Sequence, residues 1–218
     1  MKNKLFLLSF LSIFLLQVAS AQTSANGPHL GFRAGVNFAK WAISSEGVSV
    51  SFGSLTALQV RGVYQSPVGL NSSISLEAGY TGRGFDLSGI GGLFGGDDSN
   101  VRVDYVDFNG TYKYHLPSTS GFNVFFGGGL TLGYAFGGSV NDGGQREPID
   151  FDESGIQRLD LVVEPVAGFS IGESTKFVLD ARYGFGIINL ISDDTDPDAG
   201  TANNRGILIT AGIAVPIN

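Results

Sequence analysis

The chain lacks cysteine altogether and contains two histidines and one tryptophan. Without cysteine, the fold has neither disulfide bonds nor thiolate metal ligands. With two histidines, a hydrolase is not the expected class of protein, because a serine nucleophile near neutral pH needs an imidazole base close to it. Basic residues are also scarce, since 13 lysines and arginines stand against 20 acidic residues, for a formal net charge of −7. Nucleic acid is therefore not an expected partner, because phosphate binding needs a basic face.

Long hydrophobic runs are confined to the N-terminus. Lys2 and Lys4 precede an apolar run over 5–16, and the small residues Ala19 and Ala21 follow it. This pattern predicts a cleaved signal peptide over residues 1–21 and an exported domain over 22–218. An uncleaved anchor helix is the alternative, but the run is shorter than the roughly 20 residues that span a bilayer. Any later membrane passage must use strands, because no apolar run of helical length follows.

The exported part of the chain alternates between apolar and polar residues. In the first stretch Phe32, Val36 and Phe38 alternate with Arg33 and Asn37, which is the two-residue period of a β-strand. Eight stretches alternate in this way: 29 to 41, 54 to 65, 72 to 85, 101 to 115, 122 to 136, 157 to 171, 176 to 188 and 204 to 217. Each reaches the roughly 9 to 11 residues of a tilted transmembrane strand. The sequence thus predicts an all-β, eight-stranded, antiparallel up-and-down transmembrane β-barrel.

The connections between these stretches alternate in length. Those at 66–71, 116–121 and 172–175 are short, and the four others are long: 42 to 53, 86 to 100, 137 to 156 and 189 to 203. Short periplasmic turns and long external loops are typical of outer-membrane barrels, with both termini in the periplasm. The four long loops hold 13 acidic residues and one basic residue, Arg146. We therefore expect strongly acidic extracellular loops.

The pattern alone also permits a soluble, lipocalin-like binding barrel, with the apolar face lining a cavity. Two features favour the membrane barrel. The polar face is rich in glycine, for example at Gly127, Gly129 and Gly133, which suits a narrow interior that must hold long charged side chains. Aromatic residues such as Tyr112 and Phe136 gather near the strand ends, as two interfacial girdles require. We expect the charged residues to face inward.

The charges on the polar face are nearly balanced, which predicts interior ion pairs. Reflecting neighbouring stretches about their short turns brings Arg61 opposite Glu77 and Glu164 opposite Arg182. An eight-stranded barrel is just wide enough for side chains to fill it, so these pairs are expected to plug the interior. Pro165 lies within the sixth stretch and cannot donate to the ladder, so a bulge is expected there.

Several short segments carry a family resemblance: GFRAGVNF at 31 to 38, LEAGY at 76 to 80, LDL at 159 to 161 with Ala167-Gly168, and ARYG at 181 to 184. In these segments the chain resembles the Bacteroidetes outer-membrane β-barrel family that includes PorT. The resemblance implies an eight-stranded barrel, inserted by the barrel assembly machinery into an outer membrane with lipopolysaccharide. PorT serves the type IX secretion and gliding apparatus, so secretion-system proteins are implied as alternative partners.

The last long loop holds the one candidate metal site. Asp194, Asp196 and Asp198 are spaced like the carboxylates of calcium loops. However, Gly200 falls one position late for that pattern, and Arg205 stands where the closing glutamate belongs. We expect a solvated acidic loop, with divalent cations bridging it to lipopolysaccharide as the alternative. No cofactor is expected.

The two histidines bear on enzymatic function. His29 begins a stretch that runs outward and His115 ends one that runs inward, so both are expected at the periplasmic rim. Lipid-modifying barrels act at the outer leaflet, so we expect no enzyme activity here. A structural or surface-interaction barrel is the favoured function. A component of a type IX secretion apparatus and a small-solute channel are the alternatives.

Overall fold

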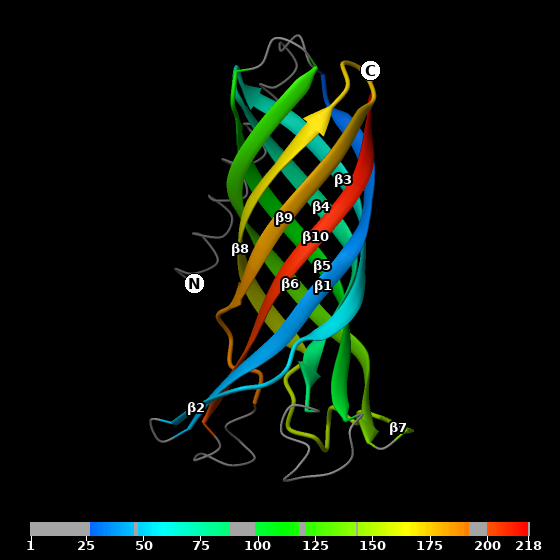
Figure 1. The fold of residues 1–218 in the computed structure, drawn as a ribbon, viewed down its shortest axis with the longest axis vertical. Helices are drawn as coiled ribbons and strands as arrows, with labels where there is room; N and C mark the ends of the chain where they lie inside the picture. Colours follow the sequence, from blue (N-terminus) through cyan, green and yellow to red (C-terminus); the bar gives the residue numbers. More distant parts are fainter. Residues whose placement is uncertain are drawn as a thin grey trace, which may run out of the picture.

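The computed structural model describes residues 27–45, 48–87, 99–117, 121–142, 144–191 and 200–217. These residues form ten β-strands, and the long ones wrap around a single axis (Figure 1). The strands are β1 (His29–Ser45), β2 (Val48–Ser51), β3 (Leu55–Gly69), β4 (Ser72–Asp86), β5 (Asn100–His115), β6 (Phe122–Asp142), β7 (Gln145–Pro148), β8 (Leu159–Ile171), β9 (Lys176–Gly186) and β10 (Thr201–Pro216). No helix among the described residues is long and apolar enough to cross a membrane.

The eight long strands close into an antiparallel barrel. Their order is β1-β3-β4-β5-β6-β8-β9-β10, and β10 pairs with β1 from His29 opposite Pro216 to Ser44 opposite Thr201. Closure satisfies both edges of the sheet, which a barrel in lipid requires because no water is available to pair with free backbone groups. The start of β1 and the end of β10 lie at the end of the barrel that carries the short turns, at the top of Figure 1.

All eight predicted strands are present, and their ends differ by a few residues. The two short strands β2 and β7 were not predicted. They pair with the loop ends of β1 and β6 and extend these hairpins beyond the barrel, at the bottom of Figure 1. Backbone hydrogen bonds suffice for such extensions, so they need no alternation of apolar and polar residues.

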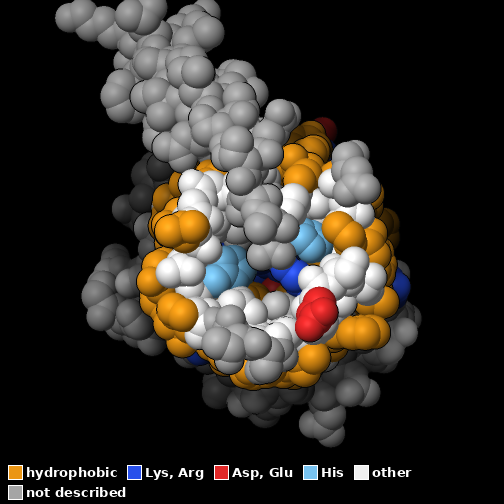
Figure 2. All heavy atoms as spheres, turned by 90° about the horizontal axis from the view of Figure 1, so that it is seen from above, with side chains coloured by type: hydrophobic (Ala, Val, Ile, Leu, Met, Phe, Trp, Pro, Cys, Tyr) orange, Lys and Arg blue, Asp and Glu red, His pale blue; other side chains and the backbone are white. Residues whose placement is uncertain are grey.

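The apolar residues face outward and the charged residues face inward. On β1, Phe32 is 56% exposed, whereas its neighbour Arg33 is 4% exposed. Seen along the barrel axis, hydrophobic side chains form the outer ring (Figure 2). A soluble lipocalin-like barrel requires the inverse arrangement, and that alternative is therefore wrong. An exposed apolar belt of this extent suits lipid contact, because soluble monomers rarely expose such patches.

Glycine on the inner face makes room for the charges, as the sequence suggested. A Cβ atom built on Gly133 would lie 2.5 Å from Nη1 of Arg83 and 2.8 Å from Oδ1 of Asp107. Any larger residue at this position would have to displace an ion pair, because the interior is already filled.

The bulge expected at Pro165 is absent. The β8–β9 register is the same before the proline, where Val163 lies opposite Phe185, and after it, where Val166 lies opposite Arg182. On the other side of β8, Pro165 lies opposite Gly128 in an unbroken ladder. The missing N–H therefore costs local pairing with β9 but inserts no extra residue.

Candidate functional site

The barrel interior is organised in three levels. A hydrophobic cluster lies at the loop end, a layer of charged residues fills the middle, and a cavity of about 410 Å³ lies at the short-turn end. Arg61, Glu164, Asp107 and Lys113, in the middle layer, are at most 2% exposed. Each level is built from inward-facing residues of several strands.

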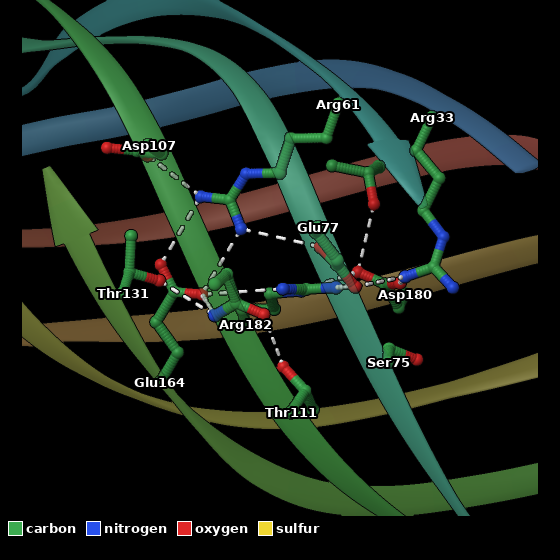
Figure 3. Close-up of polar contacts among 12 residues, drawn as sticks. Arg33, Arg61, Ser75, Glu77, Asp107, Thr111, Thr131, Glu164, Asp180 and Arg182 are labelled. Atoms are coloured by element: carbon green, nitrogen blue, oxygen red, sulfur yellow. Dashed lines mark hydrogen bonds and ion pairs between the residues drawn. The ribbon is translucent and has the colours of Figure 1, made fainter. Parts of the chain in front are cut away.

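The four residues predicted to form ion pairs meet in one closed ring (Figure 3). Arg61 lies 3.5 Å from Glu77 and 3.4 Å from Glu164. Arg182 lies 2.8 Å from Glu77 and 3.4 Å from Glu164. Each arginine therefore lies between the same two carboxylates, and the ring joins β3, β4, β8 and β9 across the barrel.

The predicted register was wrong by two residues in both pairs. Arg61 lies opposite Gly79, and Glu77 lies opposite Val63. Arg182 lies opposite Val166. A register shift of two residues leaves every side chain on the same face of its strand, so these four side chains still face inward. They are also long enough to reach one another. The β3–β4 turn explains the first shift, because it tightens to two residues through an irregularity between Pro67 and Gly69.

The ring continues into a larger network on both sides. Arg33 lies 2.6 Å from Asp180 and 3.3 Å from Glu77. Arg83 lies 2.8 Å from Asp107 and 3.5 Å from Asp160. The sequence placed these residues on the inner face but assigned them no partners. The contacts of Arg33 with Asp180 and Glu77 cross between strands that are not neighbours, and so does the contact of Arg83 with Asp160, whereas Arg83 and Asp107 lie on the adjacent strands β4 and β5. Arg158 was placed on the same face, but it is partly exposed near the loop end and lies 3.6 Å from Asp152.

Four arginines and five carboxylates form this network among the described residues, so it carries one excess negative charge. Lys113 lies on the same inner face of β5 as Asp107, a member of this network. It is fully buried, its Nζ lies 5.0 Å from the Phe125 ring centroid, and it has no hydrogen-bond partner among the described residues. Buried charge is tolerated when it is compensated nearby, and here the compensation is collective.

The hydrophobic cluster closes the loop end of the barrel. It packs Trp41, Phe85 and Tyr105 from the strands against Phe151 and Leu190 from the long connections. Trp41 and Phe85 lie with their ring centroids 4.8 Å apart. The long connections thus contribute residues to this cluster, and these contacts hold the parts of the connections nearest the strands against the barrel.

The cavity at the short-turn end is lined by both histidines, His29 and His115, with Gln65, Asn123 and Lys176 around them. Figure 2 looks onto this end and shows the two histidines beside the central hollow. The expectation that both histidines lie at the rim with the short turns agrees with this position. The sequence did not predict the cavity, whose walls come from all eight long strands and all three short turns.

The candidate metal residues Asp194, Asp196 and Asp198 lie outside the described residues. Within the residues that the structure does describe, no group of three or more histidine, aspartate or glutamate side chains is arranged to hold a metal ion. The calcium-like spacing of this loop therefore stays a sequence-based prediction.

Comparisons with known proteins support the architecture. Residues 20–192 match the family model described as an outer membrane protein β-barrel domain. No curated protein sequence matches the chain. Among solved structures, the chain is similar to Neisserial surface protein A (NspA), with 16% identity, a TM-score of 0.51, and coverage of 89% of this chain and 99% of that one. It is also similar to the outer membrane protein OprG from Pseudomonas aeruginosa, with 11% identity, a TM-score of 0.50, and coverage of 87% and 96%.

At such low identity these structures bear on the fold alone, and the fold they share with this chain is a small outer-membrane barrel. The family match covers most of the chain, including seven of the eight long strands. Together with the lipid-facing exterior and the charged interior, it identifies the location as the outer membrane. The chain belongs to the outer membrane protein β-barrel domain family.

Proposed function

We propose that this protein is a structural surface barrel, which holds its acidic loops at the cell exterior for contact with ions, lipid or other molecules. The observation that carries the proposal is the filled interior. The ring of Arg61, Glu77, Glu164 and Arg182 occupies the middle of the barrel, and the hydrophobic cluster closes its loop end. A barrel filled in this way is a rigid anchor rather than a water-filled pore.

The described part of the loops supports a surface role. Glu147, Asp150, Asp152 and Glu153 lie in the connection between β6 and β8, and all four are exposed. Carboxylates at this density attract divalent cations, which would also bridge them to the phosphates of lipopolysaccharide. Outer-membrane lipid and lipopolysaccharide are thus the first partners we propose, after insertion by the barrel assembly machinery.

Planar-bilayer recording and surface proteolysis test this function together. The purified protein is expected to give no conductance steps, and whole cells treated with protease are expected to be cut between β6 and β8. Stable conductance steps would establish a small-solute channel instead. A loop that stays intact on whole cells, while it is cut in lysed cells, would contradict display at the exterior.

A second function is favoured by the cavity at the short-turn end, which would face the periplasm. A PorT-like component of a type IX secretion or gliding apparatus needs a periplasmic surface for its partners. Co-purification of secretion-motor proteins after mild detergent extraction would support that role. Normal protein export in a deletion strain would exclude it.

A further inference from the structure

Three polar side chains in the cavity at the short-turn end form a continuous hydrogen-bonded chain. Ser73 Oγ lies 2.7 Å from Nε2 of His115, and His115 Nδ1 lies 2.7 Å from Oδ1 of Asn123. Asn123 in turn donates from Nδ2 to the backbone carbonyl oxygen of Leu116, at 3.0 Å. The serine, the histidine and the asparagine all line the cavity.

The hydrogen bond from Asn123 to Leu116 determines which atom is the donor in each of the other two hydrogen bonds. Because Asn123 Nδ2 donates to a carbonyl oxygen, its Oδ1 must point at the imidazole and can only accept. His115 therefore carries its proton on Nδ1, which leaves Nε2 as an acceptor. The hydroxyl of Ser73 must then donate to Nε2. A serine, a histidine that accepts its proton and a third group that orients the ring are the parts of a nucleophilic site.

The fold holds these residues on three consecutive long strands. Ser73 lies near the start of β4, His115 ends β5, and Asn123 lies near the start of β6. The imidazole also packs on the buried ring of Phe125, with ring centroids 5.8 Å apart. The histidine is thus oriented by a hydrogen bond on one side and by an aromatic contact on another. Such restraint is what a general base requires.

We propose that Ser73, His115 and Asn123 form a hydrolytic site for small acyl esters that enter the cavity from the short-turn end. The site goes beyond the surface role proposed above, which does not use this cavity. A cavity of about 410 Å³ is within the usual range for small-molecule sites and suits a short acyl chain. Its inner wall includes the apolar side chains of Phe125, Val178 and Ala214, which would receive that chain.

The reaction would proceed in two balanced steps. Ser73 Oγ attacks the ester carbonyl carbon while its proton passes to Nε2 of His115, and the alcohol leaves with that proton. Water then attacks the acyl-serine, gives its proton to Nε2, and the acid leaves as Ser73 Oγ regains the proton. The sum is one ester and one water converted to one acid and one alcohol. Asn123 acts as a positioning residue, because it touches the imidazole and not the reacting atoms.

Labelling with a fluorophosphonate probe tests the proposal. The wild-type protein, purified in detergent and shown to be folded by its heat-modifiable migration, is expected to gain one adduct, mapped by mass spectrometry to Ser73. It should also hydrolyse p-nitrophenyl acetate. His115→Gln should slow both reactions at least about 100-fold, which is the lower range for loss of a general base. Asn123→Ala should slow them less, and Asn123→Asp should restore them, because a carboxylate accepts the same hydrogen bond from Nδ1.

Ser170→Ala is the matched control, because Ser170 lines the same cavity and forms no hydrogen bond with either histidine in the part of the chain that the structure describes. It is expected to react like the wild type. Folded wild-type protein that gains no adduct would overturn the proposal, and the hydrogen-bonded chain would then be a structural feature of the rim. Equal labelling of wild-type and His115→Gln protein would also overturn it.

Discussion

Replacing Arg182 with alanine removes a buried guanidinium group that contacts three carboxylates. Arg182 lies 2.8 Å from Glu77, 3.2 Å from Asp180 and 3.4 Å from Glu164, and it is 3% exposed. Breaking a buried ion pair by removing one partner costs about 3 to 5 kcal/mol, because the remaining charge is left uncompensated. We expect a loss of this size in the free energy of unfolding. Removing Glu164 first relieves part of the excess negative charge, so the same substitution should then cost less.

Equilibrium urea unfolding in lipid vesicles measures this double-mutant cycle. Trp41, the sole tryptophan, lies in the hydrophobic cluster and reports unfolding by its fluorescence. The penalty for Arg182→Ala should fall by about 0.5 to 3 kcal/mol in the Glu164→Ala background, which is the usual range for residues in contact. Arg146→Ala, in the exposed strand β7, is the control and should change stability little. Equal penalties in both backgrounds would refute the coupling between Arg182 and Glu164.

Three further substitutions test other parts of the structure. Val36→Arg places a charge on the outward face of β1, and near the bilayer centre this should cost about 2 to 4 kcal/mol, measured by urea unfolding in vesicles. Gly133→Val overpacks the interior beside Arg83, and a loss of about 1 to 3 kcal/mol is expected; unchanged stability would show that the interior has free space. Trp41→Ala should cost about 3 to 5 kcal/mol by leaving a cavity in the hydrophobic cluster, and it should make the loops easier to cleave with protease. Since this variant lacks tryptophan, its unfolding is followed by heat-modifiable migration on gels.

The strands and their faces could be predicted because both follow from a period of two. Phe32 and Arg33 are neighbours in the chain, and the pleat alone sends one outward and the other inward. The lengths of the connections then gave the direction of each strand. These inferences use only the local alternation of apolar and polar residues. A strand shows this alternation when its two faces have different surroundings.

The register and the network could not be predicted in the same way. Arg61 contacts Glu164 and Arg182 contacts Glu77, although these residues lie on strands that are not adjacent. Such contacts depend on how the closed barrel staggers its strands, which no single hairpin determines. The turn between β3 and β4 adds an irregularity that a simple reflection about its centre ignores. The sequence therefore identified the charged residues of the ring but not their geometry.

The loop-end cluster and the cavity were missed for a related reason. Phe151 and Leu190 lie in connections without alternation, so nothing local distinguishes them from exposed loop residues. Ser73, His115 and Asn123 come together only because three strands begin or end at the same rim. A search for histidines near the ends of paired strands would have brought Ser73 and His115 together, since the two strands are consecutive.

The central claim is that apolar side chains face lipid while charged ones face one another, and a cysteine scan along β10 tests it most directly. Because the native chain has no cysteine, each variant from Ile207 to Val215 carries one thiol for a spin label. In vesicles, collision rates with oxygen should be high at the odd positions and low at the even ones, since Ile207, Ile209 and Ile213 are exposed and Leu208 and Thr210 are buried. A scan without this period of two, or with the even positions in contact with lipid, would contradict the orientation.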